Sequence, residues 1–468
     1  MDPVVEKRPR VRPRFKRWAI VVGVLVALLL AHTTWDYVEA RSLTTALATY
    51  APDYGTAPPV KPVPADRDAA PYYAAAAVLA VRWGEHVSGF DTSRREQWVD
   101  GEVPAEMLER IGQMLSSRAD ALYLVDQATA REFGGFRPDA SSLNLMHLLL
   151  AKRLVSARAL YAATRGDAAL ATRSLVAQLK MEGAERSPIT ALSLQTWLLS
   201  WRTATVQDLQ YLLSHVTPDA DSLEQLSTVF AAADEDTQLT RFFSLARERW
   251  IDGYMRRIGR VDDSFGSAGM LGDGSRQLSV YRRILRPLLA RDLRKKLQAY
   301  ARILDASTAP WPERLDRIVA SNAPAGAFER RLAAIAGFPG DPGWIEDAEP
   351  WWRLQQLRIA AADLAGIRAA RVAVAVERYR RTHNGVLPVS LTDLTPELLP
   401  TLPIDPFSGK PIRFASAPEA YVVYSVGPNG TDDRGAEAGS QVIVPTPRRG
   451  PEARRTGDIG VRIRTNPR

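Results

Sequence analysis

The chain has 468 residues, of which 46% are hydrophobic, so it is long and apolar enough for two or three domains and is not a disordered protein. It contains no cysteine, which excludes disulfides, cysteine-ligated metal sites and a cysteine nucleophile. Of the net charge of +8, residues 1–17 and 445–468 each carry +5, leaving residues 18–444 at −2, and a near-neutral folded part argues against a nucleic-acid partner.

The first element is a basic tail followed by an apolar segment. Residues 1–17 contain seven lysines and arginines and two acids, whereas residues 18–35 contain no acidic side chain, lysine or arginine. A helix of that length spans roughly 27 Å, close to the thickness of the hydrocarbon core of a bilayer. The positive-inside rule places the tail in the cytoplasm and the chain after Trp35 outside it. We therefore predict a single-pass anchor in a bacterial inner membrane with a periplasmic body.

The alternative for this segment is a cleaved signal peptide, because the strictly apolar core, residues 18–31, is short for a membrane span. Val38 and Ala40 form the one pair of residues suited to a cleavage site, and they lie far from that core. In both interpretations the body is exported. We favour the uncleaved anchor.

Residues 36–71 form a predicted periplasmic linker. Six prolines lie between Ala51 and Pro71, among few apolar residues. This composition predicts an extended spacer that holds the body off the membrane.

Residues 72–345 predict an irregular, antiparallel helical domain, because apolar residues recur mostly at helical spacing and no alternating strand pattern is found. The clearest pair of helices is 148–164 and 167–182. Gly166 suits the end of the first helix, and Asp167 suits the N-cap of the second. Such short turns resemble those of tetratricopeptide-type stacks, but no fixed period runs along the chain, so an irregular bundle is favoured.

Residues 350–444 predict a small α+β domain with an antiparallel sheet, and residues 445–468 a basic tail. A helix with one apolar stripe comes first, to pack on the sheet. The stripe consists of Leu364, Ile367, Ala370, Val374 and Tyr379. Two strand-like runs, 411–415 and 421–426, follow it and predict a hairpin.

Three short motifs occur in order within this region. They are the helix-ending group Tyr379, Asn384, Gly385 and Pro388, the turn Asp405, Pro406 and Phe407, and the loop Ser425, Gly427, Asn429 and Gly430. In this order they resemble the C-terminal globular part of a type II secretion major pseudopilin, a type IV pilin-like fold. Taken with the helix and strands around the motifs (residues 350–444), the likeness covers about a fifth of the chain.

The chain departs from the pseudopilin pattern in two ways. No glutamate lies near the start of the apolar segment, and more than 300 residues separate that segment from Leu364, whereas in a pseudopilin the membrane helix and the globular helix are contiguous. We therefore expect a pseudopilin-like domain attached to another protein, not a filament subunit.

The resemblance implies a calcium site in the loop after the second strand. The expected ligands are Ser425, Asn429, Asp432, Asp433 and Asp458. Calcium takes six to eight oxygen ligands, usually carboxylates mixed with backbone carbonyls from a sharply turning loop. The alternative is a solvated turn after an edge strand.

Other candidate chemistry is sparse. The five histidines are dispersed and form no metal-ligand pattern. A glycine-rich loop at residues 262–274 lacks the Gly-Lys-Ser/Thr ending of a phosphate-binding loop. Its aspartates, Asp262, Asp263 and Asp273, are candidates for hydrolysis of envelope glycan if a partner acid lies nearby.

Four tryptophans lie near the boundary between the two domains: Trp311, Trp344, Trp351 and Trp352. Tryptophans near prolines often seal interfaces between domains, and we favour that role over a platform for stacking sugars.

With no nucleophile, metal or cofactor pattern in the sequence, a binding or scaffold protein in a secretion or pilus-related assembly is favoured over an enzyme. The expected partners are the inner membrane and envelope assembly proteins, without nucleic acid. The alternatives are an envelope hydrolase that uses carboxylates and a solitary ligand-binding or sensor protein.

Overall fold

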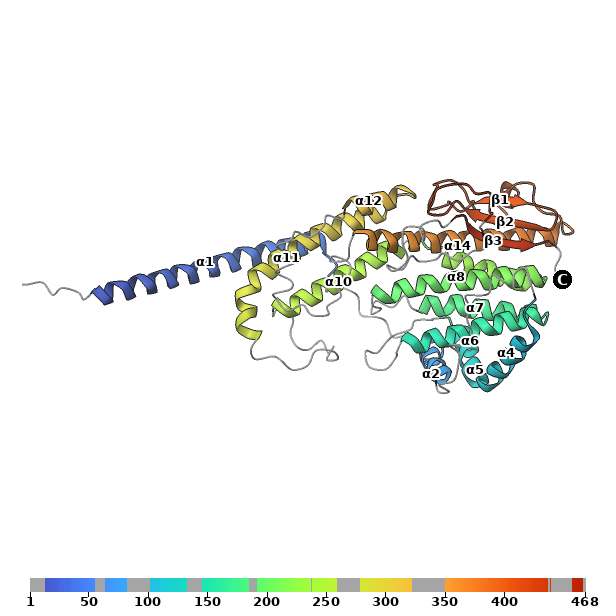
Figure 1. Ribbon diagram of the computed structural model, residues 1–468, viewed down its shortest axis with the longest axis horizontal. Coiled ribbons are helices and arrows are strands. Elements are labelled where there is room, and N and C mark those ends of the chain that lie inside the picture. Colours follow the sequence, from blue (N-terminus) through green and yellow to red (C-terminus); the bar gives the residue numbers. More distant parts are fainter. Residues whose placement is uncertain are drawn as a thin grey trace, which may run out of the picture. The chain divides into compact units, whose positions relative to one another are not determined.

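The structure is a computed structural model, mainly helical, which describes residues 13–54, 64–81, 102–132, 145–184, 192–236, 238–258, 278–321, 350–436, 438 and 457–465. Within these residues twelve α-helices, one 3-10 helix and three strands are formed (Figure 1). The helices are α1 (Pro13–Tyr50), α2 (Ala70–Val81), α4 (Ala105–Ser117), α5 (Ala119–Thr129), α6 (Leu145–Thr164), α7 (Ala168–Ala184), α8 (Leu192–His215), α9 (Ala220–Ala233), α10 (Gln238–Ile258), α11 (Leu278–Ser307), α12 (Glu313–Ser321), α14 (Pro350–Thr382) and the 3-10 helix η4 (Leu391–Leu394). The strands are β1 (Arg413–Ser416), β2 (Ala420–Ser425) and β3 (Ile459–Arg464).

The chain divides into two units, each assembled from separate stretches of sequence. Unit 1 comprises Met1–Pro58, Ala246–Arg302 and Ala325–Gly340. Unit 2 comprises Pro59–Leu245, Ile303–Pro324 and Asp341–Arg468.

In unit 1, α1 is one continuous helix that includes the predicted span. It is the one described helix that is long and apolar enough to cross a membrane. Every side chain from Trp18 to Leu30 is exposed, with Trp18 70% and Leu25 59% accessible. The helix then continues past Trp35, so residues 36–50, which the sequence assigned to a linker, are helical.

The second half of α1 packs against α10 and α11. Leu43 and Ala46 are buried in a core with Ile251 of α10 and Leu293 and Leu297 of α11. Apolar residues recur every three to four positions in this half of α1 and form one face. Such a face must be covered by a partner, which explains the packing.

Ion pairs border this core at its α11 side. Asp36 lies 3.4 Å from Arg286, and Glu39 lies 3.2 Å from Arg294. The two acids that follow the apolar segment of α1 are thus neutralised within unit 1.

In unit 2, the turn between α6 and α7 confirms the predicted helix pair. Gly166 has φ of +78°, the left-handed conformation that ends a helix without a Cβ penalty. Asp167 caps α7 by accepting a hydrogen bond from the backbone of Leu170 at 2.9 Å.

The C-terminal sheet is antiparallel with the order β1-β2-β3. The predicted hairpin is present, with Arg413 of β1 opposite Tyr424 of β2. The third strand comes from the segment predicted as a basic tail: Val461 of β3 lies opposite Val423 of β2. The alternation of Ile459, Val461 and Ile463 with smaller or basic residues lets β3 bury one face.

Helix α14 lies between the sheet and the helices of unit 2 (Figure 1). All residues from 361 to 377 are buried except Arg371. One face packs on β2 and β3, and the other packs on α8 and α9. Val374 of α14, Leu209 of α8 and Val461 of β3 belong to one hydrophobic core, so the boundary drawn before residue 350 does not separate two cores.

Candidate functional site

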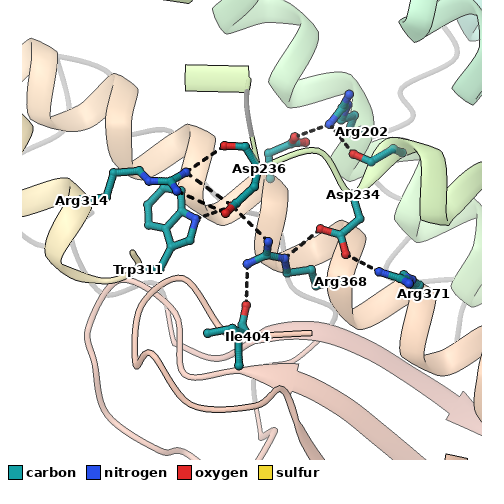
Figure 2. Close-up of polar contacts among 10 residues, drawn as sticks. Arg202, Asp234, Asp236, Trp311, Arg314, Arg368, Arg371 and Ile404 are labelled. Atoms are coloured by element: carbon teal, nitrogen blue, oxygen red, sulfur yellow. Dashed lines mark hydrogen bonds and ion pairs between the residues drawn. The ribbon is translucent and has the colours of Figure 1, made fainter. Parts of the chain in front are cut away.

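A group of buried charges lies where α8, α9, α12, α14 and the loop before the sheet meet (Figure 2). We call it the arginine–aspartate cluster. It consists of Arg202, Asp234, Asp236, Arg314, Asp363, Arg368 and Arg371.

Two of the three acids of the cluster, Asp234 and Asp236, lie at an unfavourable place for negative charge. Asp234 is the C-cap of α9, and Asp236 follows two residues later. The C-terminus of a helix carries a partial negative charge, which repels carboxylates. Burial adds a desolvation cost, since the side chain of Asp234 is only 6% exposed. Cations from elsewhere are therefore needed here.

Helix α14 supplies two of these cations from residues three apart, which share one helix face. Arg368 Nε donates to Asp234 Oδ1 at 2.9 Å, and Arg371 Nη1 donates to Asp234 Oδ2 at 2.7 Å. Arg368 also donates through Nη2 to Asp236 Oδ1 at 3.1 Å and through Nη1 to the carbonyl of Ile404 at 2.7 Å. One guanidinium thus joins α9, α14 and the loop that leads to the sheet.

The start of α12 supplies the other partners of Asp236. Trp311 Nε1 donates to Asp236 Oδ1 at 2.7 Å, and Arg314 Nη2 donates to Oδ2 at 3.2 Å. The Arg314 guanidinium also lies over the Trp311 ring, 4.5 Å from its centroid. Burial by itself raises the pKa of Asp236, but the indole hydrogen bond and the charges of Arg314 and Arg368 outweigh it and lower the pKa below 3.8.

A third pair lies deeper in the cluster. Arg202 Nη1 of α8 donates to Asp363 Oδ2 of α14 at 3.1 Å, and both side chains are at least 92% buried. The same Nη1 lies 3.5 Å from the carbonyl of Ala233, at the end of α9. This pair joins α8 to α14 inside the unit.

The arginine–aspartate cluster has the composition of a group that holds helices together. Each of its three carboxylates is paired with at least one arginine, and its side chains include no hydroxyl, thiol or imidazole. Asp236, whose pKa is lowered, is a poor general acid at neutral pH. The predicted interface role of Trp311 agrees with this position, and the side chains of the other three tryptophans lie outside the described residues.

Three of the residues predicted to bind calcium lie together. Asp458, just before β3, accepts hydrogen bonds from the backbone of Asp433 at 3.3 Å and of Gly435 at 2.6 Å. Asn429 Nδ2 donates to Asp433 Oδ2 at 3.1 Å. Burial raises the pKa of Asp458 above 3.8, and the nearby charge of Asp433 raises it further against those two hydrogen bonds. These two acids repel each other across the loop.

The other two predicted ligands have different partners. Asp432 forms an ion pair with Arg413 of β1 and accepts from the Tyr424 hydroxyl at 3.1 Å. Ser425 is fully buried, and its hydroxyl donates to Asp405 Oδ1 at 2.6 Å. Among the described residues, no three histidine, aspartate or glutamate side chains form a group ready to hold a metal ion.

Asp405 is a residue whose role sequence reasoning did not predict beyond a turn. It is fully buried and accepts four hydrogen bonds, including one from the backbone of Phe407 at 2.9 Å and one from Val426 at 3.2 Å. It ties the turn before β1 to the end of β2. The signal was the Asp-Pro-Phe-Ser string, in which an aspartate followed by proline commonly accepts from the backbone two residues on.

Comparison with protein-family models, with curated proteins and with solved structures finds no match for this chain. The resemblance of residues 379–430 to major pseudopilins therefore stays a prediction. The glycine-rich loop at 262–274, with its three candidate acids, lies outside the described residues.

Proposed function

We propose that this chain is a membrane-anchored scaffold or binding protein with a single inner-membrane span, a cytoplasmic N-terminal tail and a periplasmic body. The observation that carries the proposal is the continuity of α1. One helix presents an exposed apolar surface from Trp18 to Leu30 and, further along, a packed face at Leu43 and Ala46. An exposed apolar surface of this size on a soluble protein is unfavourable, and a bilayer satisfies it.

The pairing of the carboxylates in unit 2 favours a scaffold role over catalysis. The arginine–aspartate cluster uses its carboxylates to hold helices together, and Asp405 does the same for the sheet. Each of the three carboxylates of the cluster has an arginine partner from another element, which fits a role in holding those elements together.

Membership in a secretion or pilus-related assembly is the more specific part of the proposal. It rests on the C-terminal helix, on the three-stranded antiparallel sheet, and on Asp458 returning to the loop after β2. A resemblance of fold alone does not establish function.

The topology is tested with single-cysteine variants of the full chain, since the natural sequence has no cysteine. A membrane-impermeant maleimide applied to intact spheroplasts should label Thr44→Cys, and should label Val4→Cys only after lysis. Labelling of Val4→Cys in intact spheroplasts would contradict the orientation. Recovery of the protein in the soluble fraction, shortened at its N-terminus, would contradict the anchor.

The assembly role is tested separately by crosslinking in cells. A photoreactive residue at Val389, which is 96% exposed on the loop after α14, should crosslink to another envelope protein. The same residue at Arg173 on the exposed face of α7 is the control. If neither position gives a crosslinked partner, the assembly role is wrong, whatever the topology result.

A further inference from the structure

Two exposed arginines of unit 1 have no acidic partner near the end of the predicted span. Arg41 lies on α1 and Arg291 lies on α11, and both side chains are exposed. Within the part of the chain that the structure describes, neither forms an ion pair or a hydrogen bond. The two acids that follow the span are instead paired with other arginines of α11. The two exposed arginines are therefore available to an anionic partner outside the chain.

The two arginines lie at the same level along the axis of α1. Asp36 of α1 is 3.4 Å from Arg286 of α11. Seven residues further on in both helices, Leu43 and Leu293 share one hydrophobic core. The two helices therefore run side by side in the same direction and in register. Each exposed arginine is five residues past the Asp36–Arg286 pair, roughly 7.5 Å along the axis.

Both arginines face away from the core between the helices. Arg41 lies two residues before Leu43, and Arg291 lies two residues before Leu293. Each residue turns an α-helix by roughly 100°, so residues two positions apart lie on nearly opposite sides of it. The pair of helices thus carries one exposed arginine on each of its two outer sides.

This level corresponds to the lipid headgroups if α1 crosses the bilayer as proposed. The uncharged segment ends at Trp35, and Arg41 follows six residues later, roughly 9 Å further along the axis. The headgroups add about 5 to 7 Å to each side of the hydrocarbon core. Side chains of a helix tilt toward its N-terminus, which in both helices is the membrane side. Both long arginine side chains therefore lean back toward the headgroups.

We propose that Arg41 and Arg291 bind the phosphate groups of phospholipids in the outer leaflet, one on each side of the helix pair. The inference rests on the proposed membrane anchor and goes beyond it by assigning two lipid contacts that fix its depth. A guanidinium suits this partner, because it is always charged and its planar fork donates two parallel hydrogen bonds to a phosphate. The acids at this level are already paired within unit 1 and do not compete for the two arginines.

The test measures which lipids lie beside each arginine, using a fluorophore on a single cysteine of the full-length chain. Thr34→Cys lies about two turns before Arg41, on the same side of α1. Leu29→Cys lies about four turns before Leu43, on the side that faces α11. The chain is reconstituted in galactolipid vesicles, which contain no phosphate. A trace of nitroxide-bearing phosphatidylglycerol, phosphatidylcholine or galactolipid serves as the quencher.

We expect both phospholipids to quench each label more strongly than the galactolipid does. For phosphatidylglycerol the preference should be roughly fivefold, the gain that one arginine contributes near an anionic lipid. Phosphatidylcholine carries the same phosphate and should also be preferred.

Two substitutions serve as controls for each other. Arg41→Gln should remove the preference for phospholipid at the Thr34 label and leave it at the Leu29 label. Arg291→Gln should have the opposite effect. Arg153→Gln, at an exposed position of unit 2, should change the preference at neither label.

A label at Val24→Cys, in the middle of the span, separates this inference from the anchor, because all three lipids should quench it. If they do, and neither arginine substitution changes the lipid preference, the phosphate contacts are wrong and the anchor stands. A preference for phosphatidylglycerol without one for phosphatidylcholine overturns the assignment to phosphate, since net charge alone gives that result. A Val24 label that no lipid quenches overturns the anchor itself.

Discussion

Arg368 joins three separate parts of unit 2 through a single guanidinium, with acceptors on Asp234, Asp236 and Ile404. Its side chain is 9% exposed, so its charge is stabilised by these partners and not by water. Without Arg368, Asp234 keeps Arg371 and Asp236 keeps Arg314, but the carbonyl of Ile404 loses this donor.

We therefore expect Arg368→Ala to lower the free energy of unfolding by about 2 kcal/mol, the usual cost of leaving a buried hydrogen-bonding group unsatisfied. The effect is measured by denaturant unfolding of the full chain in detergent. Arg358→Ala is the matched control, since Arg358 lies on the same helix and is exposed. Equal losses in the two variants would show that the contacts of Arg368 add nothing to stability.

Calcium binding at the loop after β2 remains a prediction. Of the expected acidic ligands, Asp433 and Asp458 lie together. Asp433 and Asp458 raise each other's energy as anions, and a cation between them would relieve that repulsion. Millimolar calcium should therefore raise the melting temperature of the full chain above its value in EDTA, by mass action on the folded state.

Two substitutions check which residues act as ligands. Asp433→Asn should abolish the rise in melting temperature. Asp432→Asn should retain most of it, because Asp432 is already paired with Arg413. Identical melting curves in calcium and in EDTA for the unchanged chain would remove the site.

At the scale of elements, the loop after β2 comes very close to the backbone just before β3 at one glycine, Gly427. Gly427 and Gly430 both have positive φ, +66° and +68°. A Cβ on Gly427 would lie 2.1 Å from the carbonyl oxygen of Gly457, whereas a Cβ on Gly430 would meet nothing within 4 Å.

Gly430→Ala should therefore cost about 1 kcal/mol, the strain of a left-handed alanine. Gly427→Ala carries the same strain and must also push Gly457 away, which displaces Asp458 and the start of β3. We expect a clearly larger loss of stability, measured by thermal unfolding of the two variants side by side. Similar melting temperatures would mean that β3 does not depend on this contact.

The turn between α6 and α7 and the hairpin of β1 and β2 could be predicted from the sequence, because residues close together in the chain determine both. Gly166 and Asp167 mark a helix end and a helix start by their own backbone and side-chain preferences. The hairpin of β1 and β2 follows from two β-rich runs close together in the chain. Neither requires knowledge of a distant partner.

The contacts that the sequence did not predict are long-range. Strand β3 has only three large apolar residues, a weak signal in the sequence. The edge of β3 that does not pair with β2 lies against α8, where Gln210 accepts a hydrogen bond from the backbone of Arg462 at 3.2 Å. The stripe on α14 predicted one packed face, but the helix also packs on α8 and α9, and Gly366 faces Val206 of α8, where an added Cβ would lie 3.8 Å from that side chain. The arginine–aspartate cluster was missed because residues that pair within it lie up to 161 positions apart in the chain.

At the scale of the molecule, the shared core changes what is expected of the C-terminal region. The sequence predicts a separate α+β domain at residues 350–444. In the structure the second face of α14 and the edge of β3 are covered by α8. Without that cover, apolar surface of α14 and β3 that is buried in the full chain is exposed to water. The lost burial costs more free energy than the packing of α14 on the sheet contributes.

A fragment of residues 350–468 should therefore show no cooperative thermal transition by circular dichroism, while the full chain shows one. Adding residues 192–236, which supply α8 and α9, as a separate peptide should restore structure in part. A sharp transition of the fragment by itself would show that the sheet and α14 form an independent domain after all.

The way unit 1 is assembled has a consequence for its synthesis. Glu39 can pair with Arg294 only after 255 further residues have been synthesised. The carbonyl of Tyr50 can accept from Arg247 only after 197 further residues. At about 5 to 20 residues per second, a ribosome takes roughly 10 to 50 s to make the intervening chain. During that interval α1 is in place but Leu43 and Ala46 have no partner. The nascent protein therefore passes through a stage in which the apolar face of α1 at Leu43 and Ala46 is open to a chaperone or to another protein.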